Sequence, residues 1–276
     1  MERFLSELQH ELSIDDARFL ASFALADLAD YITAVFDRNF SLVRYAESLT
    51  VSETSFAEIE RNIDSPILTE FYKPLLEELF GNENCQNELH SRSPLLVCIS
   101  VPFAGTFTAA LFTGRFFKQR YGKRAFVCIG GGFVNTELRD ADDVALSAYI
   151  DAISYDRGYG SYKQLLDSAF LQKGIAPLYK MRLFTGGKCI PPLADTTCTA
   201  YTTARQFESD MTATLVPDYG DIDFAQYPRV CDDTNPMHRL WSDGAWIKVY
   251  MAHGCYWHQC AFCDVTLDYV CSFCPT

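Results

Sequence analysis

The sequence predicts an α/β fold, in which a helical N-terminal region precedes a parallel, doubly wound sheet. Apolar residues recur at helical spacing through residues 1–90, whereas short continuous apolar runs alternate with helical stretches over residues 93–173. Continuous apolar runs are typical of strands buried on both faces, and their alternation with helices favours a parallel sheet. Hydrophobic residues make up 49% of the chain, which suffices for a packed core.

Polar residues that commonly begin helices precede three apolar stretches of the N-terminal region. They are Ser13–Asp16, Thr54–Ser55 and Ser65–Pro66. The side chains of such residues accept hydrogen bonds from the first N–H groups of a helix. We therefore expect three helices here, whose apolar faces are buried in the core.

Three strands and three helices are expected to form the sheet domain. The strands are predicted at 95–101, 125–129 and 149–153, and the helices at 106–121, 142–147 and 161–172. Ligands of such sheets bind beyond the carboxyl ends of the strands. Those ends carry Ser100, the glycines at 130–132 and the loop at 156–160.

The region that follows, residues 174–245, has no clear period and contains Gly186-Gly187 and Pro191-Pro192. It is predicted to be a linker that packs on the surface. A final strand at 246–252 then leads into a cysteine-rich segment. The predicted divisions are a helical region (1–92), the sheet domain (93–173), the linker (174–245) and the start of a further domain (246–276).

Composition argues against two kinds of partner. The net charge is −13 and the pI about 4.8, so the surface repels phosphate backbones and a nucleic-acid partner is disfavoured. We expect no apolar stretch to reach the ~20 residues that span a bilayer, and the N-terminus lacks the features of a signal peptide. We expect a cytoplasmic protein with no membrane partner.

The chain has eleven cysteines, an odd number whose distribution does not resemble a secreted disulfide framework. Cys98 and Cys128 lie inside apolar runs and are expected to be buried thiols. Five cysteines fall within the last 22 residues, which indicates a specialised segment.

Cys255, Cys260 and Cys263 have the spacing of an iron–sulfur motif, with four and then two intervening residues. Short loops let several thiolates converge on one cluster. Three protein ligands leave one iron open to chelate S-adenosylmethionine (SAM). His253 and His258 flank this segment and are expected to serve in packing or hydrogen bonding.

Other interpretations of these cysteines remain open. The pairs Cys260/Cys263 and Cys271/Cys274 suit a four-thiolate zinc site, although the seven residues between the pairs are fewer than the usual 15–20. A dithiol redox pair and a set of free thiols are the remaining alternatives.

Residues 235–244 and 254–269, which include the three cysteines, resemble the radical SAM proteins that carry a cobalamin-binding domain. The resemblance extends over about residues 93–270 and is strongest over 235–270. It implies a Rossmann-like sheet of the cobalamin-binding type, followed by the start of a radical SAM β/α barrel. It also implies that Cys255, Cys260 and Cys263 bind a [4Fe-4S] cluster and that Phe262 lies near the adenine of SAM.

The chain departs from the family pattern at two points. The commonest spacing has three residues between the first two cysteines, where this sequence has four. Cys271 and Cys274 have no place in the pattern, and an auxiliary cluster is one interpretation of them.

A cobalamin site is implied at the ends of the first two sheet strands. In related folds a serine and a glycine pair line the slot for the nucleotide tail, and Ser100 with Gly130, Gly131 and Gly132 match this arrangement. Glycine permits close backbone approach to a ligand. A tight turn that serves only the fold is the alternative. The Asp-x-His-x-x-Gly motif is absent, so the cofactor would be held without a protein histidine.

The expected function is SAM cleavage that starts radical chemistry, such as methylation, on a small-molecule or peptide substrate, with flavodoxin or ferredoxin as the electron donor. The alternative is a non-catalytic metal- or cobalamin-binding protein. Only 13 residues follow Cys263, whereas a full barrel has ~250 residues. We therefore expect the chain to be a fragment that does not turn over.

Overall fold

The computed structural model describes residues 14–40, 56–81, 94–168, 176–223, 251–261, 263 and 267–275. The chain divides into two compact units. The first comprises Met1–Ser48 and Val216–Val249, and the second comprises Leu49–Leu215 and Tyr250–Thr276. We call the second the sheet unit and describe each by itself.

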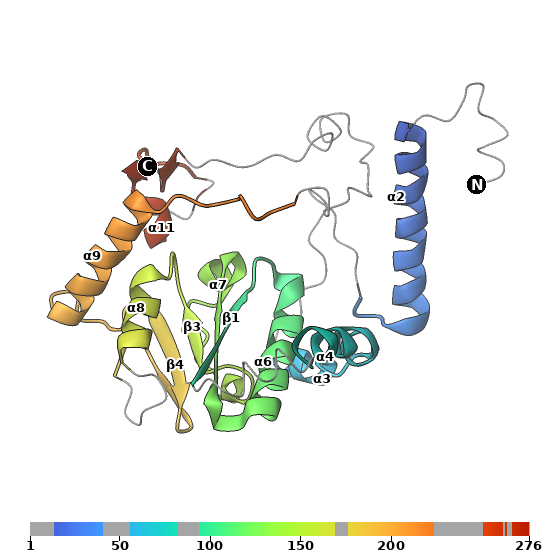
Figure 1. Cartoon of the computed structure of the whole chain (residues 1–276), viewed down its shortest axis with the longest axis horizontal. Helices are drawn as coiled ribbons and strands as arrows, with labels where there is room; N and C mark the ends of the chain where they lie inside the picture. The colour runs from blue at the N-terminus through green and yellow to red at the C-terminus, as the bar shows by residue number, and fades with distance from the viewer. Residues whose placement is uncertain are drawn as a thin grey trace. The chain divides into compact units, whose positions relative to one another are not determined.

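The described part of the first unit contains the helix α2 (Ile14–Tyr31), which continues into the π-helical turn η1 (Ile32–Phe36) (Figure 1). The helix predicted to begin near Ser13–Asp16 is confirmed. Its window Phe19–Phe36 has a mean hydropathy of 1.5 and is long and apolar enough to cross a membrane, with 6% of the window buried. The expectation that no stretch reaches such a length is therefore wrong. Core helices of soluble proteins and signal sequences can be equally long and apolar, so the length and hydropathy of this helix do not assign the protein to a membrane.

Five strands form one sheet among the described residues, and their spatial order follows the chain. They are β1 (Leu95–Ser100), β2 (Ala125–Gly130), β3 (Ala152–Ser154), β4 (Met181–Thr185) and β5 (Lys188–Ile190). The first three are parallel to one another, whereas β4 and β5 are antiparallel to their neighbours.

The predicted α/β class is confirmed, but the described sheet is mixed rather than parallel throughout. Met181 at the start of β4 pairs with Ser154 at the end of β3, so β4 runs back along its neighbour. The strand order also has no reversal, which a doubly wound sheet requires. An antiparallel edge strand on a parallel sheet is common in mixed folds.

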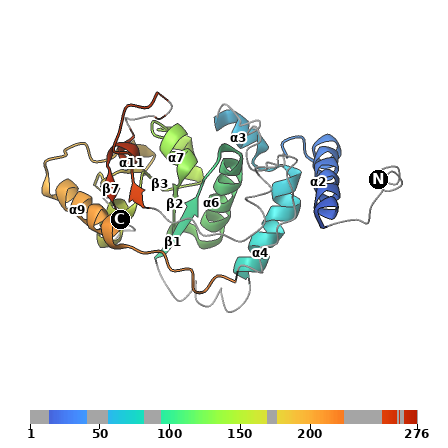
Figure 2. The ribbon, with the colours of Figure 1, turned by 90° about the horizontal axis from the view of Figure 1, so that it is seen from above.

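Two helices lie next to the strands on one face of the sheet, and the helices that precede β1 extend the same core beyond them (Figure 2). The two next to the strands are α6 (Phe107–Tyr121) and α7 (Gly132–Glu137), and the helices that precede β1 are α3 (Phe56–Asn62), η2 (Ile67–Tyr72) and α4 (Lys73–Gly81). Apolar side chains of these helices share one core with alternate residues of the strands, such as Val127, Ile129 and Ile153. The helices predicted near Ser55, Ser65 and Thr106 are thereby confirmed.

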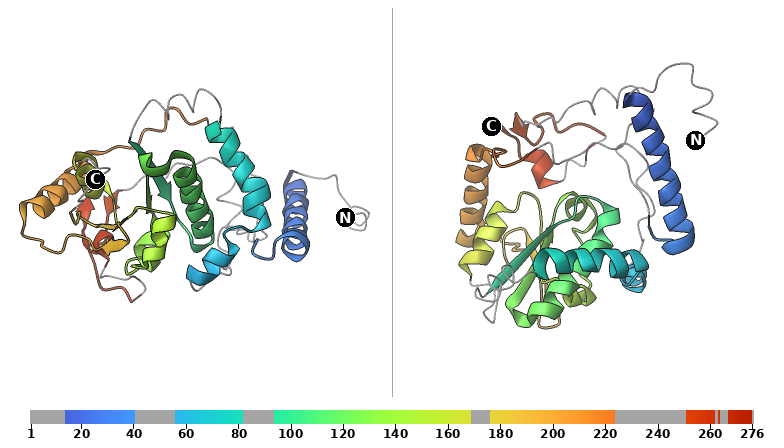
Figure 3. Two further views of the ribbon diagram at one scale, coloured as in Figure 1. Left: turned by 90° about the horizontal axis from the view of Figure 1, so that it is seen from below. Right: turned by 45° about the vertical axis from the view of Figure 1, so that its right-hand side comes forward.

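The opposite face carries α8 (Tyr159–Asp167), which buries Leu165 against Phe126 and Leu183. The helix α9 (Thr199–Thr214) lies beside α8 (Figure 3). The approach is close, because a Cβ at Gly160 would lie 2.5 Å from the carbonyl oxygen of Ala204.

The strand β1 lies at one end of the described sheet order, and this position corrects an expectation. Cys98 on β1 is exposed, whereas its register partner Cys128 on β2 is fully buried. The apolar run at 95–101 predicted burial on both faces, but an edge strand has one neighbour fewer. The burial of Cys128 is confirmed.

The region 174–245 is not simply a linker. Within it lie β4, β5 and α9, and Met181, Leu183 and Phe184 are core residues. Residues 224–245 lie outside the described residues. The helix expected at 142–147 is the 3-10 turn η5 (Val144–Ala148), and similar turns, η3 (Ala104–Thr106) and η4 (Gly122–Arg124), flank α6.

The C-terminal segment of the sheet unit forms a second, two-stranded sheet. Its strands β6 (Ala252–His253) and β7 (Cys274–Pro275) are antiparallel, and the short helix α11 (Asp268–Cys271) precedes β7. Of the strand predicted at 246–252, only Met251 and Ala252 lie within the described residues, and Ala252 begins β6.

Candidate functional site: the carboxyl edge of the sheet and the cysteine loop

The carboxyl ends of the parallel strands bring the predicted cofactor residues side by side. We call this part of the sheet, with Ser100, the glycines at 130–132 and the turn at 156–160, the carboxyl edge. Ser100 at the end of β1 is the register partner of Gly130 at the end of β2, and Ser100 is exposed. Just beyond the strands, the Val101 N–H donates to the Gly130 carbonyl oxygen at 2.7 Å. The Phe133 N–H donates to the Val101 carbonyl oxygen at 3.1 Å, so the pairing continues into α7.

The glycines at 130–132 pass very close to neighbouring backbone. Gly131 has a φ of +113°, and a Cβ there would lie 2.7–3.0 Å from backbone atoms of Val101. A Cβ at Gly132 would lie 3.1 Å from the Pro102 carbonyl oxygen, and one at Gly130 would lie 3.3 Å from that of Ser154. The fold alone thus requires glycine at 131, in agreement with the fold-only interpretation of this turn.

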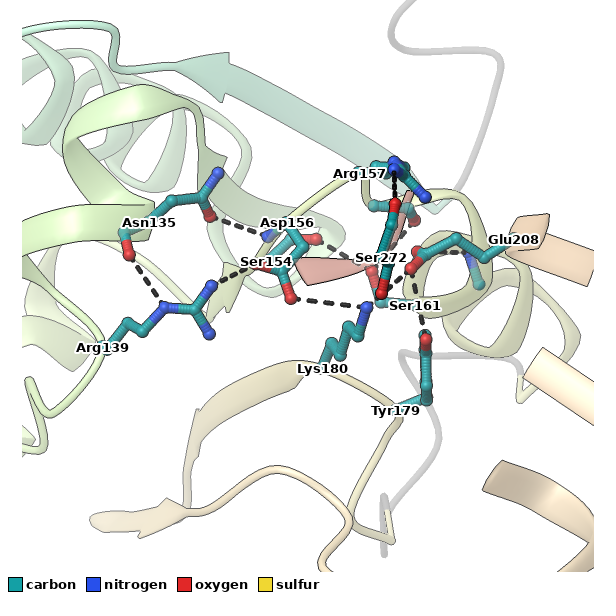
Figure 4. Close-up of polar contacts among 12 residues, drawn as sticks. Asn135, Arg139, Ser154, Asp156, Arg157, Ser161, Tyr179, Lys180, Glu208 and Ser272 are labelled. Atoms are coloured by element: carbon teal, nitrogen blue, oxygen red, sulfur yellow. Dashed lines mark hydrogen bonds and ion pairs between the residues drawn. The ribbon is translucent and has the colours of Figure 1, made fainter. Parts of the chain in front are cut away.

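The turn after β3 is held in an uncommon conformation by buried polar contacts (Figure 4). Asp156 has a φ of 60°, which non-glycine residues rarely adopt. Its N–H donates to Oδ1 of Asn135 at 2.7 Å. Its carboxylate is 2% exposed, forms an ion pair with Arg139 and lies 3.4 Å from Nζ of Lys180.

Lys180 connects this turn to α9. Its Nζ donates to Oε1 of Glu208 at 2.8 Å, and the Glu208 side chain is 5% exposed. The Tyr179 hydroxyl donates to the same carboxylate at 3.2 Å, and the Gly160 N–H donates to it at 3.4 Å. Lys180 also has a positive φ, 47°. We call Asp156, Lys180 and Glu208 the buried charge network.

The cysteine-rich segment forms a closed loop, residues 252–275, which we call the cysteine loop. Ala252 and His253 pair with Pro275 and Cys274 at its base. Two residues beyond His253, the Cys255 N–H donates to the Val270 carbonyl oxygen at 2.8 Å. The first cysteine of the motif is therefore fixed beside Val270, a contact that the sequence could not predict.

Cys255 receives backbone hydrogen bonds that suit a thiolate. The N–H groups of His258 and Trp257 lower the pKa of the Cys255 thiol from its usual value. His258 has a φ of 52°, so the chain turns sharply there. Donors aimed at sulfur stabilise the thiolate form, which is the form that binds metals.

The three cysteines of the motif do not converge in this structure. Within the described residues, no group of three or more His, Cys, Asp or Glu side chains is arranged to hold a metal ion. Cys255 and Cys260 are partly buried, and Cys263 is exposed. The donor chemistry thus fits an iron–sulfur cluster, but the arrangement of the thiols does not yet form a site. Phe262 lies outside the described residues.

Three of the described cysteines outside the loop, Cys128, Cys189 and Cys198, accept hydrogen bonds from neighbouring residues. Burial raises the pKa of Cys128 to about 12, and the Tyr162 hydroxyl donates to its Sγ at 3.3 Å. Cys198 caps α9, where its Sγ accepts the Tyr201 N–H at 3.4 Å. Nη1 of Arg182 donates to Sγ of Cys189 at 3.6 Å. Buried thiols held in the neutral form are inert, so Cys128 is a core residue.

Arg157 joins the carboxyl edge to the cysteine loop. Its Nη2 donates to the Ser272 carbonyl oxygen at 3.1 Å, between Cys271 and Cys274 (Figure 4). Burial, together with the nearby Arg157 charge, lowers the pKa of His253. Sequence reasoning marked the loop at 156–160 by its place after a strand. It missed Lys180 and Glu208, which no local pattern connects to that loop.

Comparison of the chain with protein-family models, curated proteins and solved structures found none that matches it. The residues and geometry of the carboxyl edge and the cysteine loop are therefore the basis for a functional proposal.

Proposed function

We propose that this protein is a radical SAM iron–sulfur protein whose sheet unit contains a cobalamin-binding domain. Cys255, Cys260 and Cys263 are the proposed ligands of a [4Fe-4S] cluster. The observation that carries the proposal is the spacing of these cysteines within a closed loop that contacts the carboxyl edge of an α/β sheet. When bound, such a cluster supplies the electron that cleaves SAM reductively.

The surroundings of Cys255 support the first half of this proposal. Two backbone N–H groups already point at its sulfur, and the Val270 carbonyl oxygen fixes its backbone. Hydrogen bonds of this kind orient and tune metal ligands. Cluster assembly has to draw Cys260 and Cys263 toward Cys255. Phe262 would then contribute to the SAM site.

The edge residues support the cobalamin half. Ser100 is exposed and lies beside Gly130, so a ligand can approach the ends of β1 and β2 there. Ligands of open α/β sheets bind at such ends. Cobalamin would carry a methyl group to a small-molecule or peptide substrate, with flavodoxin or ferredoxin as electron donor. The proposed location is the cytoplasm, where thiols are kept reduced.

One observation favours a second candidate, a structural zinc site without turnover. The pairing of His253 with Cys274 brings the Cys271/Cys274 pair to the base of the loop that carries Cys260 and Cys263. Two Cys-x-x-Cys pairs on one loop are a common source of four thiolate ligands.

Anaerobic reconstitution with iron and sulfide tests the proposal. We expect the unaltered chain to take up the iron and sulfide of one cluster and to absorb in the visible range of iron–sulfur proteins. Cys255→Ala, Cys260→Ala and Cys263→Ala should each abolish this uptake. Cys98→Ala is the matched control, because Cys98 is an exposed thiol outside the loop, and it should retain full uptake.

Three outcomes would contradict the proposal or part of it. Full iron loading of a variant that carries all three Cys→Ala changes would reject the ligand assignment, and stoichiometric zinc with no iron uptake would favour the structural site. Corrin absorbance that does not remain with the protein after gel filtration would reject the cobalamin half. Release of 5′-deoxyadenosine over several turnovers would reject only the expectation that this chain does not turn over.

A further inference from the structure

The cysteine loop contacts the rest of the sheet unit at Ser272, where the first part of the loop (residues 252–255) lies against its last part (residues 270–275). Gly254, in the first part, has a φ of +76°, and a Cβ there would lie 2.5 Å from the Ser272 carbonyl oxygen in the last part. Gly254 immediately precedes Cys255, and Ser272 lies between Cys271 and Cys274. A group that holds the Ser272 carbonyl therefore fixes the base of the whole loop.

Arg157 is the group that reaches this point from the sheet. Its guanidinium donates to the Ser272 carbonyl oxygen at 3.1 Å in a part-buried position. A charged donor makes a stronger hydrogen bond than a neutral one. The acceptor is a backbone oxygen, so the contact depends on the path of the loop and not on any loop side chain.

The backbone of Arg157 is itself held in place through its neighbour Asp156. It lies between two residues of positive φ, Asp156 (60°) and Gly158 (80°). Asn135, Arg139 and Lys180 all contact Asp156 (Figure 4). A residue in so rare a conformation persists only where its surroundings determine it strongly. The buried charge network thus holds the turn that presents Arg157.

We infer that Arg157 is a positioning residue that docks the cysteine loop on the carboxyl edge of the sheet, with the buried charge network as its rigid base. Under the proposed function, on which this role rests, the contact sets where a cluster on Cys255, Cys260 and Cys263 lies relative to Ser100 and Gly130. The proposal assigns Arg157 no contact with substrate or cofactor.

Hydrogen–deuterium exchange of the metal-free chain tests the docking. In Arg157→Ala we expect the Cys255 amide, which donates to Val270, to exchange about tenfold faster, the change expected on losing one charge-assisted hydrogen bond. Arg157→Lys keeps a charged donor and should restore most of the protection. Arg205→Ala, an exposed arginine on α9, is the matched control and should leave the loop unchanged.

The sheet provides an internal reference in the same sample. The Val101 amide, which donates to Gly130, should keep its exchange rate in every variant. Loop protection that is unchanged in Arg157→Ala overturns the inference, and so does an equal rise at Val101, which would mean that the whole unit is destabilised. Because no metal is present, these outcomes are independent of iron uptake, whose failure would reject only the proposed function.

Discussion

At the residue scale, the closest approach at the carboxyl edge is the one between Gly131 and Val101. Any side chain at 131 meets backbone atoms of Val101 at 3.0 Å or less and also has to adopt a φ of +113°. The N–H and the carbonyl oxygen of Val101 are both hydrogen-bonded, so these backbone atoms cannot move aside as a flexible side chain can. The constraint on this glycine is therefore steric and conformational at once.

We predict that Gly131→Ala lowers the free energy of unfolding by about 2–4 kcal/mol, from the clash and the unfavourable φ together. Gly105→Ala is the control, because a Cβ at Gly105 meets nothing within 4 Å, and it should change stability by less than about 0.5 kcal/mol. Urea unfolding measures both. Equal midpoints for the two variants would show that the edge tolerates a side chain, as a slot for a ligand would.

Single residues were partly predictable. The cysteine motif is visible in the sequence because its spacing is local, and the burial of Cys128 follows from its apolar neighbours. The contact of Arg157 with Ser272 joins residues 115 positions apart, and no local pattern encodes it. The exposure of Cys98 follows from strand order, which the composition of β1 does not reveal.

At the element scale, α9 is held against the sheet unit by the carboxylate of Glu208. The helix is rich in threonine and other polar residues, and among the residues of α9 Ala204 is the one buried apolar residue, so its packing depends on few apolar contacts. Glu208 compensates by accepting hydrogen bonds from Tyr179, Lys180 and Gly160. Glu208 is also the nearer of the two carboxylates that neutralise Lys180: its Oε1 lies 2.8 Å from Nζ, whereas Oδ2 of Asp156 lies 3.4 Å away.

We predict that Glu208→Ala destabilises the protein by about 3 kcal/mol, because it removes one partner of a buried ion pair. Asp210→Ala removes an exposed carboxylate from the same helix and should cost less than about 0.5 kcal/mol. Thermal unfolding followed by circular dichroism compares the two. A loss as small for Glu208→Ala as for Asp210→Ala would mean that the network contributes little to holding α9.

The same polar character explains why sequence reasoning missed these elements. Arg182 interrupts the apolar residues of β4, and β5 is only three residues long, so neither forms the long continuous apolar run that predicts a buried strand. A helix between two strands usually signals a parallel crossover. Here β4 begins beside the end of β3, so the chain enters the sheet from the other direction. The parallel part, β1 to β3, had the clear alternation of strand and helix and was predicted well.

At the scale of the whole molecule, the sheet cannot be separated from the helices at 56–81. The division expected at residues 92 and 93 treats those helices as a separate region. Their side chains instead share the core of the sheet, with Ile63 2% and Leu76 4% exposed. Aromatic pairs join them to α6, including Phe80 with Phe117 at 5.0 Å between ring centroids. The compact unit accordingly begins at Leu49.

Two truncations test this boundary. Removal of residues 1–48 takes away only residues of the first unit, so the remaining chain should keep a cooperative unfolding transition with little change in midpoint. Removal of residues 1–92 also takes away four buried core side chains, which are Ile59, Ile63, Leu68 and Leu76. Burial of each contributes about 1.5–3 kcal/mol, so their joint loss of about 6–12 kcal/mol matches the whole stability of a typical domain, about 5–15 kcal/mol. The longer truncation should therefore lack the near-ultraviolet circular dichroism of a packed core. A folded product from it would mean that β1, β2 and α6 form a core without these helices.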